Sequence, residues 1–365
     1  MYDYLIVGAG VAGCVLAERL AASGFQVILV EKRSHIGGNA YDEYNQDGIL
    51  IHRYGPHIFH TNSKTIWDYL SRFSEWYLYQ HKVLAYVDSI QVPIPVNLDT
   101  VNTLYNYQFS SDELQVYLAK SRGKVGIDKI NDARDMAISR VGLDLYEKFF
   151  KNYTRKQWDL WPEELDPEVT GRIPVRLNRD ARYFTDKYQG LPKYGYTRMF
   201  ERMLQHQNIH ILLQADYKMI IDNLNFNQVI YTGPIDYFFD YVHGRLPYRS
   251  LHFDYETLPV EYHQDVGTIN YPNDYDFTRI TEYKYLTGQK HQMTTLSREY
   301  PRAEGDPYYP IPTPKNQQLY LKYALEAEKL ANVSFIGRLA EYRYYSMDQV
   351  ITRVFNWLRD KSVGL

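Results

Sequence analysis

The sequence predicts an α/β protein: a Rossmann-like dinucleotide-binding domain with an inserted helical domain and an inserted antiparallel β-sheet domain. Three observations carry this prediction. A complete strand–glycine loop–helix–strand unit opens the chain, a strand–helix pair closes it, and the residue pattern between them is different. A chain of 365 residues is also too long for one simple core. The two ends are therefore expected to fold together around the inserted segments.

The opening unit carries the pattern of a dinucleotide-binding motif. Its parts are a strand at 4–7, the glycine run 8–13, a helix at 14–20 and a second strand at 26–30. The glycines let the backbone approach a pyrophosphate at the N-terminus of the helix. Glu31 follows the second strand, where an acidic side chain binds the ribose hydroxyls. We expect Gly8, Gly10, Gly13 and Glu31 to bind the cofactor.

The next residues favour a flavin over a nicotinamide. Residues 31–39 read EKRSHIGGN, with an arginine two positions after the acid and then a Gly-Gly pair. This stretch resembles the extension of amine-oxidase-type flavoproteins, in which the Gly-Gly lets the chain pass close to the cofactor. A plain turn between elements is the alternative. FAD is therefore the expected cofactor, and Arg33, Gly38 and Asn39 are further expected contacts.

A second cofactor segment is expected near the C-terminus. Residues 333–336 form a strand, Gly337 and Arg338 form a tight junction, and residues 347–358 have the spacing of an amphipathic helix. Gly337 and Arg338 are therefore expected beside the cofactor. The expected limits are 1–80, 205–245 and 312–365 for the FAD-binding domain, 98–165 for the helical domain, and 81–97, 166–204 and 246–311 for the sheet domain.

The pattern of apolar residues changes twice in the middle of the chain. Residues 110–151 have apolar residues at three- and four-residue steps and predict helices. Residues 248–300 alternate and are interrupted by Asn, Asp and Pro, which is typical of antiparallel strands. Residues 83–96 and 172–183 are the expected partners of that sheet.

Composition narrows the functional classes. The formal net charge is −3, which provides no global positive field for nucleic acid or an anionic membrane. Cys14 is the single cysteine, so no intrachain disulfide is expected, and neither a signal peptide nor a membrane-spanning stretch is visible. A cytoplasmic location is therefore expected. Tyrosine occurs 37 times, which suits stacking on sugars and bases but also fits general enrichment.

Several short segments resemble the UDP-galactopyranose mutases and keep their order over essentially the full length. They are 54–61 (YGPHIFHT), 153–158 (YTRKQW), 172–176 (RIPVR), 188–190 (YQG), 231–236 (YTGPID), 248–251 (YRSL), 306–310 (DPYYP) and 337–342 (GRLAEY). The resemblance implies interconversion of UDP-galactopyranose and UDP-galactofuranose without net redox change, through a covalent adduct between the sugar and N5 of reduced FAD. It also implies a homodimer and a role in galactofuranose-containing surface glycans.

The resemblance assigns site residues. Departure of UDP leaves negative charge on the diphosphate, which guanidinium groups stabilise, and Arg172 and Arg279 stand at the matching positions. His57 is expected beside the flavin as a third catalytic residue. The expected substrate-binding residues are Phe149 and Tyr153 for uracil, Trp158 for galactose, and Tyr183, Tyr309 and Tyr344 for phosphate oxygens. Surface arginine and core aromatic packing are the alternatives, and Tyr308 competes with Tyr309.

Some positions depart from the family pattern or stay open. Family members carry Tyr-x-Asp-Met near the C-terminus, whereas Ser346 stands here in place of the acid and Asp348 follows two residues later. Pro56 stands where many members have alanine. Trp67 is either a substrate contact or core, and His60 is either a buried structural histidine or, with His57, a metal site, which the lack of further ligands disfavours. Residues 165–178 are a candidate mobile lid.

Three other functions compete with this reading. An amine-oxidase-type flavin oxidoreductase shares both cofactor segments but does not require two separated arginines with a tyrosine cluster. A mutase for another nucleotide sugar, such as UDP-N-acetylgalactosamine or a pentose, would account for Ser346 and Pro56. A flavin-stabilised binding protein without catalysis would account for the missing acid. No metal and no nucleic-acid partner are expected.

Overall fold

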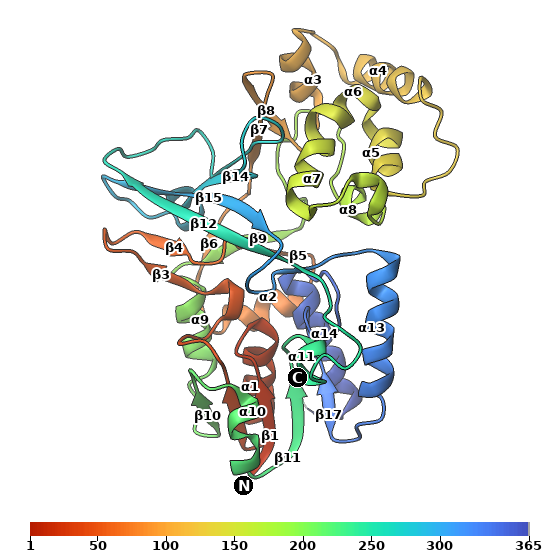
Figure 1. The fold of residues 1–365 in the computed structure, drawn as a ribbon. Coiled ribbons are helices and arrows are strands. Elements are labelled where there is room, and N and C mark those ends of the chain that lie inside the picture. The colour runs from red at the N-terminus through yellow and green to blue at the C-terminus, as the bar shows by residue number, and fades with distance from the viewer. Residues whose placement is uncertain (364–365) are drawn as a thin grey trace.

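A five-stranded parallel sheet forms the lower lobe of the protein in a computed structural model that describes residues 1–363 (Figure 1). The strand order is β10 (Ile209–Leu212), β2 (Val27–Val30), β1 (Tyr2–Val7), β11 (Phe226–Tyr231) and β17 (Val333–Phe335). All four residues of β2 are buried, as expected for a strand that is covered on both faces. The N-terminal unit and the C-terminal strand therefore share one sheet, and the predicted fold class is confirmed.

Helices cover both faces of this sheet. One face carries an aliphatic core formed with α1 (Val11–Ala22), α2 (Lys64–Ser71), α9 (Tyr196–Met203) and α14 (Met347–Asp360). The other face is aromatic, and Tyr217, Tyr231 and Phe238 pack there. Its elements are α10 (Tyr217–Ile220), η4 (Ile221–Asn223) and α11 (Ile235–Phe238), while α13 (Pro314–Ala327) lies against β17 at the sheet edge.

A seven-stranded, mostly antiparallel sheet forms part of the upper lobe. Its order is β16 (Tyr309–Pro310), β12 (Tyr248–Leu258), β15 (Thr294–Arg302), β14 (Arg279–Glu282), β13 (Thr268–Asn270), β7 (Val83–Val87) and β8 (Ile90–Ile94). The longest pairing joins β12 to β15, from Ser250 opposite Arg302 to Leu258 opposite Thr294. The β13–β7 pair is parallel, and its two strands come from distant parts of the chain.

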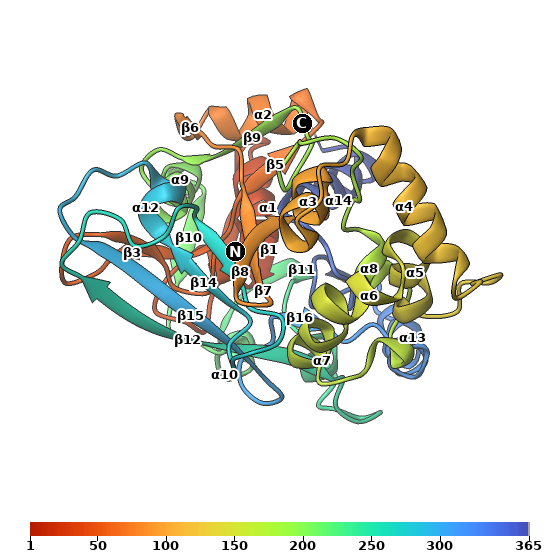
Figure 2. The same ribbon diagram turned by 90° about the horizontal axis from the view of Figure 1, so that it is seen from above.

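The helices of the upper lobe pack beside this sheet, as the view from above also shows (Figure 2). They are α3 (Leu98–Tyr105), α4 (Ser111–Gly123), α5 (Ala133–Val141), α6 (Leu143–Tyr146), a π-helical turn η2 (Glu147–Lys151) and α7 (Asn152–Trp158), followed by η3 (Pro162–Glu164) and α8 (Glu168–Gly171). Ser110 caps α4 through a reciprocal bond with Glu113. Phe149 and Phe150 join Val83 and Val87 in one core, which fixes η2 against β7.

Short elements link the two lobes. A two-stranded sheet joins β3 (Asp42–Tyr44) to β4 (Leu50–His52), and a three-stranded sheet has the order β5 (Phe59–Thr61), β9 (Tyr188–Pro192) and β6 (Trp76–Leu78). The remaining elements are η1 (Gly38–Ala40) and α12 (Tyr283–Thr287). Within residues 1–363, no helix is both long and apolar enough to cross a membrane.

Two expectations about the sheet domain were wrong: that residues 172–183 pair with it as a strand, and that all of residues 166–204 belong to it. Residues 172–183 form no strand, and only an isolated bridge joins Arg182 to Lys82. Residues 188–192 form β9, which pairs with β5 and β6 instead of the seven-stranded sheet. Residues 196–203 form α9, whose buried side chains belong to the core of the parallel sheet. Local alternation neither guarantees a strand nor reveals its partner, because pairing is decided by distant chain segments.

Candidate functional site

Two adjoining cavities lie between the lobes. The first, of about 1540 Å³, is lined by the glycine loop after β1 and by the junction after β17, and the second, of about 1810 Å³, lies under the seven-stranded sheet and α7. Both exceed the roughly 300–1,000 Å³ of a pocket for a drug-sized ligand. His57, Trp158 and Arg338 line both cavities, so they mark the place where the cavities meet.

Glycines form one wall of the first cavity. Gly8, Gly10, Gly38 and Gly337 all line it. Gly8 has φ of +100° and Gly337 has φ of +112°, conformations that side chains rarely adopt, and a Cβ on Gly38 would lie 2.8 Å from Gly10 Cα. This wall is therefore bare backbone at the N-terminus of α1, which suits an approaching pyrophosphate.

Gly13 has a different role from the one predicted. It does not line either cavity. A Cβ at this position would lie 1.9 Å from the carbonyl oxygen of Gly8, so the absence of a side chain lets α1 pack closely on β1. Gly13 thus shapes the loop and is not itself in position to contact a ligand in that cavity.

The predicted polar residues of the cofactor motif are held in place. The Glu31 carboxylate accepts hydrogen bonds from the backbone amides of Ala9 (2.8 Å) and Arg33 (2.9 Å). The Arg33 guanidinium donates to Asn39 Oδ1 (2.9 Å) and lies 4.4 Å from the ring centre of Tyr54. Glu31, Arg33 and Asn39 all line the first cavity.

His57 lies at the meeting point with one ring nitrogen fixed. Its Nδ1 lies 2.8 Å from the carbonyl oxygen of Gly55, and a carbonyl only accepts, so Nδ1 carries the proton. Burial lowers the pKa of His57 to about 4, which keeps the ring neutral near pH 7. Its backbone amide donates to Nδ1 of His52, 3.0 Å away. His57 thus offers a neutral Nε2 where the cavities meet.

Two arginines from separate elements enter the second cavity. Arg172 follows α8, and its guanidinium carbon lies 4.3 Å from the ring centre of Tyr344. Arg279 opens β14, donates from Nη2 to the Tyr153 hydroxyl (2.7 Å) and has Nε 3.4 Å from Glu299 Oε1. Burial alone would lower the pKa of Arg279, but the Glu299 carboxylate raises it, so the guanidinium stays charged.

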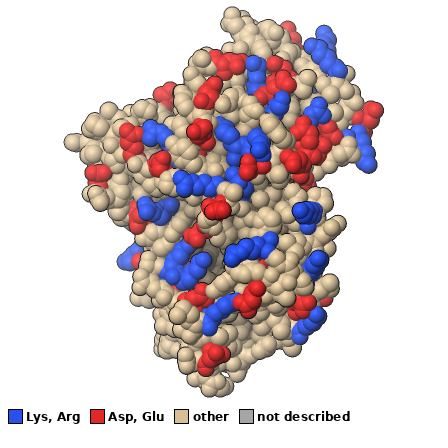
Figure 3. Space-filling model, viewed as in Figure 1, with Lys and Arg blue, Asp and Glu red and all other residues tan. Residues whose placement is uncertain are grey.

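In Figure 3, Lys and Arg side chains lie among Asp and Glu side chains on the face where the lobes meet. Inside the second cavity, three arginines act on the Tyr344 hydroxyl. Burial would raise the pKa of Tyr344, but the guanidinium groups of Arg172, Arg338 and Arg279 lower it overall. The part of the cavity around Tyr344 is therefore electropositive and suits an anionic ligand.

The aromatic residues divide between cavity and core. Phe149, Tyr153, Trp158, Tyr183, Tyr309 and Tyr344 all line the second cavity. Tyr309 and Tyr344 stack with ring centres 5.3 Å apart, whereas Tyr308 lines the first cavity. Trp67 lines neither cavity and stacks on Trp76 at 4.1 Å. Of the open alternatives, the structure places Tyr309 in the second cavity and Trp67 partly buried against the core of the parallel sheet.

The proposed lid is anchored at its first half. Leu165 and Val169 are buried in a cluster with Ala133 and Trp158. Arg172 stands just beyond α8 and reaches the Tyr344 ring. The first half of residues 165–178 is thus packed against the helices, and Arg172 follows this packed part. Motion of the segment stays a prediction.

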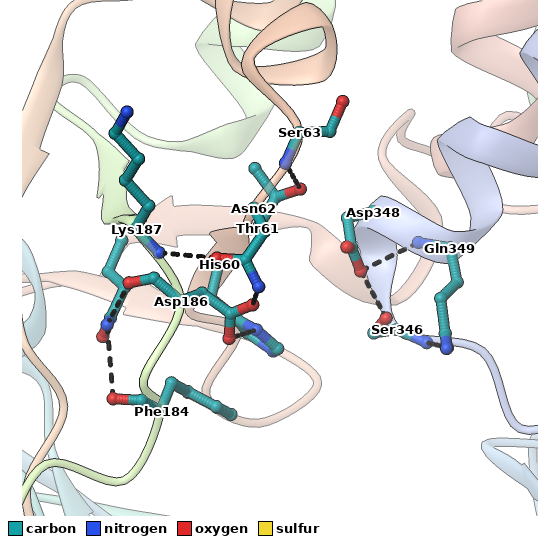
Figure 4. A network of polar contacts seen from close by, with 11 residues as sticks. His60, Thr61, Asn62, Ser63, Phe184, Asp186, Lys187, Ser346, Asp348 and Gln349 are labelled. Carbon is teal, nitrogen blue, oxygen red and sulfur yellow. Dashed lines mark hydrogen bonds and ion pairs between the residues drawn. The ribbon is translucent and has the colours of Figure 1, made fainter.

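Ser346 lines the second cavity at the N-terminus of α14 (Figure 4). Its hydroxyl donates to Asp348 Oδ1 at 2.5 Å, and the same carboxylate oxygen accepts from the backbone amide of Gln349 at 2.8 Å. Asp348 itself is not part of the cavity wall. The acid two residues later therefore acts on the Ser346 hydroxyl and does not replace a carboxylate in the cavity.

Sequence reasoning missed some residues of this site. Glu299 is 3% exposed and pairs with Arg279, and its place opposite Arg279 follows only from the β14–β15 register. Arg249 is buried on the wall of the first cavity and donates to the Gln157 carbonyl oxygen (3.0 Å). It lay within a segment that carried the family resemblance, which was the available signal. Asp186 lines the second cavity beside His60, and no motif had marked it.

The side chains of this site were also compared with the requirements of a metal centre. Across residues 1–363, no group of three or more His, Cys, Asp or Glu side chains is arranged to hold a metal ion.

The fold and the glycine-lined cavity define a Rossmann-like nucleotide-cofactor protein whose inserted segments cover a second, arginine-lined cavity. Residues 6–73 match the model of the NAD(P)-binding Rossmann-like domain family. Residues 148–344, more than half of the chain, match the UDP-galactopyranose mutase family. The chain belongs to the UDP-galactopyranose mutase family and is an enzyme of the isomerase class.

Similar proteins support this membership and broaden the choice of substrate. A "Probable UDP-galactopyranose mutase" of Klebsiella pneumoniae is 40% identical over 96% of this chain and 92% of its own length. A dTDP-fucopyranose mutase of Escherichia coli is 36% identical over 96% of both chains. The crystal structure of a reduced UDP-galactopyranose mutase superposes with a TM-score of 0.79, covering 100% of this chain and 94% of that one, and at 14% identity it shows the shared fold.

Proposed function

We propose that this protein interconverts UDP-galactopyranose and UDP-galactofuranose, with FAD bound in the first cavity. The observation that carries the proposal is the convergence of Arg172 and Arg279 with Tyr309 and Tyr344 in a cavity that meets the glycine-lined one at Arg338. Guanidinium groups with tyrosine hydroxyls suit a diphosphate. An oxidase acting on a small amine does not need them.

FAD fits the first cavity on the residues present. The bare glycine wall would accommodate a pyrophosphate, Glu31 would bind the ribose hydroxyls, and Arg338, which lines both cavities, would hold the cofactor at the place where they meet. In its reduced form, FAD supplies a nucleophilic nitrogen, N5, for covalent catalysis at the anomeric carbon. His57 presents a neutral Nε2 at the same place and does not add charge to the site.

The second cavity then binds the nucleotide and stabilises the leaving diphosphate. Arg172 and Arg279 approach from different elements, so together they can hold both phosphates and compensate the charge that develops as the bond to the sugar breaks. Phe149 and Tyr153 frame the base, Trp158 borders the sugar, and Tyr183, Tyr309 and Tyr344 bond phosphate oxygens. These roles rest on the family resemblance and on the common cavity.

A second substrate class has a specific observation in its favour. Ser346 presents a neutral hydroxyl where the family pattern has an acid, and a dTDP-fucopyranose mutase is 36% identical to this chain. Fucose carries a methyl group where galactose carries a hydroxymethyl group. A wall without a carboxylate accepts such a deoxysugar more readily, because no ionised acceptor is left unpaired. UDP-N-acetylgalactosamine stays the further alternative.

Conversion assays separate these substrates. The purified protein with its FAD is incubated with UDP-galactofuranose, with and without dithionite, and UDP-galactopyranose is followed by chromatography. dTDP-fucopyranose and UDP-N-acetylgalactosamine are assayed in parallel, and hydrogen peroxide is measured throughout. Conversion of UDP-galactofuranose only after reduction supports the proposal. Preferential conversion of dTDP-fucopyranose moves the assignment to the second class.

Other results refute the mutase assignment itself. Stoichiometric hydrogen peroxide on turnover identifies an oxidase. Tight binding of UDP-galactose to the reduced protein without any conversion identifies a binding protein. Arg279→Gln serves as the matched negative control, because it keeps side-chain size close while removing the charge that pairs with Glu299.

We propose a cytoplasmic location, a homodimer and a role in the supply of galactofuranose for surface polysaccharides, as the family resemblance implies. The buried, unpaired thiol of Cys14 is consistent with a reducing compartment. Sedimentation of the FAD-bound protein tests the dimer directly, and a monomer at micromolar concentration contradicts it.

A further inference from the structure

Lys156 belongs to the segment 153–158 but lines neither cavity. Its neighbours on α7, Tyr153, Gln157 and Trp158, all line the second cavity. Lys156 lies three residues after Tyr153, and residues three apart share one side of a helix. The Lys156 side chain therefore leaves α7 on the same side as Tyr153 without entering the cavity, and its role comes from what else it contacts.

Three backbone carbonyl groups hold the Lys156 ammonium. Nζ donates hydrogen bonds to the carbonyl oxygens of Tyr271, Tyr275 (2.8 Å) and Phe277 (3.1 Å). An ammonium has three N–H donors and no acceptor, and carbonyl oxygens only accept, so the charged form uses all of its donors here. Burial lowers the pKa of Lys156 to about 8, and the side chain is therefore still mainly an ammonium at pH 7.

The three carbonyl groups belong to the loop 271–277, which joins β13 to β14. The Tyr271 amide donates to the Thr278 carbonyl oxygen at 2.9 Å and closes the base of this loop. Residues 272–277 form neither helix nor strand, and residues 273–276 are exposed. Such a loop lacks the ladder of hydrogen bonds that holds a strand, so the three bonds to one ammonium fix where its backbone lies.

A second tie joins the same loop to the helices. Asn273 Oδ1 accepts from Asn152 Nδ2 at 3.0 Å, and Asn273 Nδ2 donates to the Lys148 carbonyl oxygen at 3.1 Å. Asn152 opens α7, and Lys148 belongs to η2, which also carries Phe149. The loop is therefore bonded to the start of α7 through Asn273 and to a later turn of α7 through Lys156.

The loop leads directly to an arginine of the second cavity. Arg279 opens β14, and its Nη2 donates to the Tyr153 hydroxyl of α7 at 2.7 Å. Glu299 of β15 holds Arg279 from the sheet, with Nε and Oε1 3.4 Å apart. The contact between Tyr153 and Arg279 thus joins a helix to a sheet, and its geometry depends on the separation of α7 from the β13–β14 hairpin. Lys156 sets that separation, because it stands on α7 and its bonds end on the loop of the hairpin.

We propose that Lys156 is a positioning residue for the nucleotide site, because its bonds to the loop 271–277 hold α7 at the separation from β14 at which Tyr153 and Arg279 meet. Arg279 then presents its charge to the diphosphate on the side of the cavity that Tyr153 forms. Without the ammonium, α7 and the hairpin are free to separate, and the arginine loses its partner on the helix. This inference rests on the proposed function, which places the nucleotide in the second cavity.

The test measures UDP binding to the FAD-bound protein by isothermal titration calorimetry. Lys156→Met keeps the aliphatic stem and removes the donors, and the Kd of UDP is expected to rise roughly 10-fold, which corresponds to about 1.4 kcal/mol. In an Arg279→Gln background the same substitution is expected to change Kd by less than about 2-fold, because no arginine is left to position. The FAD content is expected to stay unchanged, since Lys156 does not line the first cavity. A purely structural role predicts the same fold change in both backgrounds.

Two further variants complete the experiment. Lys151→Met is the matched control and is expected to leave Kd unchanged, because Lys151 pairs with Glu147 at 3.8 Å outside both cavities. Asn273→Ala removes the second tie at an exposed position and tests the same loop if Lys156→Met does not fold. It is expected to raise Kd by a smaller factor, and again only when Arg279 is present. Equal fold changes in both backgrounds, or an unchanged Kd in Lys156→Met and Asn273→Ala, overturn this inference alone. Absence of UDP binding by the unmodified protein overturns the proposed function as well.

Discussion

Removal of the Arg172 guanidinium is the sharpest test of the second cavity. Arg172 lines that cavity and not the first, so Arg172→Ala is expected to impair binding of the nucleotide sugar and leave FAD in place. A hydrogen bond to a charged group contributes about 1.5–3 kcal/mol. Since about 1.4 kcal/mol is tenfold, kcat/KM is expected to fall roughly 10- to 150-fold. Arg172→Lys keeps the charge without the planar guanidinium group, and its kcat/KM is expected to lie between that of the unmodified protein and that of Arg172→Ala.

The assay compares turnover with cofactor content in the same preparation. Initial rates with the reduced protein give kcat/KM, and the ratio of flavin to protein absorbance gives FAD occupancy. Arg179→Ala is the matched control, because Arg179 lies in the same loop between α8 and β9 but pairs with Asp99 at the surface. Equal losses of FAD and turnover in Arg172→Ala refute the assignment, as does an equal loss in the Arg179 control.

Further predictions concern specificity, pH and the glycine loop. Ser346→Asp is expected to raise kcat/KM for UDP-galactofuranose relative to the dTDP-deoxysugar, and an unchanged ratio removes Ser346 from the specificity argument. Burial lowers the pKa of His52 and His81 to about 3, so below the unfolded value of about 6.5 only the unfolded chain takes up these protons. The contribution of each histidine to the free energy of unfolding is therefore fully present above that pH and falls by about 1 kcal/mol per pH unit between about pH 6 and 4. Thermal melts of His52→Gln should show a weaker pH dependence than those of the unmodified protein. Gly13→Ala places a Cβ 1.9 Å from the Gly8 carbonyl oxygen and is expected to lower the free energy of unfolding by about 1–3 kcal/mol and to reduce FAD retention. A melting temperature and an FAD content equal to those of the unmodified protein would contradict this.

Much of the cofactor half was predictable because its signals are local. The strand, the glycine loop, α1 and Glu31 lie within one short stretch, and their spacing alone specifies how the backbone turns. The closing strand β17 and helix α14 have equally clear apolar spacing. Such motifs predict both an element and its neighbours, since consecutive parallel strands and their helix pack together.

The sheet and substrate half was less predictable because its contacts are between distant residues. The segment 172–183 alternates enough to suggest a strand, yet only an isolated bridge joins it to Lys82, and it carries Arg172 as a loop instead. β9 pairs with β5 and β6, more than a hundred residues earlier. Pairing of this kind depends on which edges become adjacent after folding, and the residues of one strand do not encode that.

The sequence by itself determined the class of the protein: a dinucleotide-binding α/β fold and membership of a mutase family, through motifs whose spacing is local. Only the tertiary structure decided which side chains share a cavity. It brought Glu299 to Arg279 through the β14–β15 register, turned Asp348 onto the Ser346 hydroxyl, and joined His60 to Asp186 across β5 and the loop before β9. The physical reason is that a polar side chain acquires its role from the partner that satisfies its hydrogen bonds, and those partners lie far away along the chain.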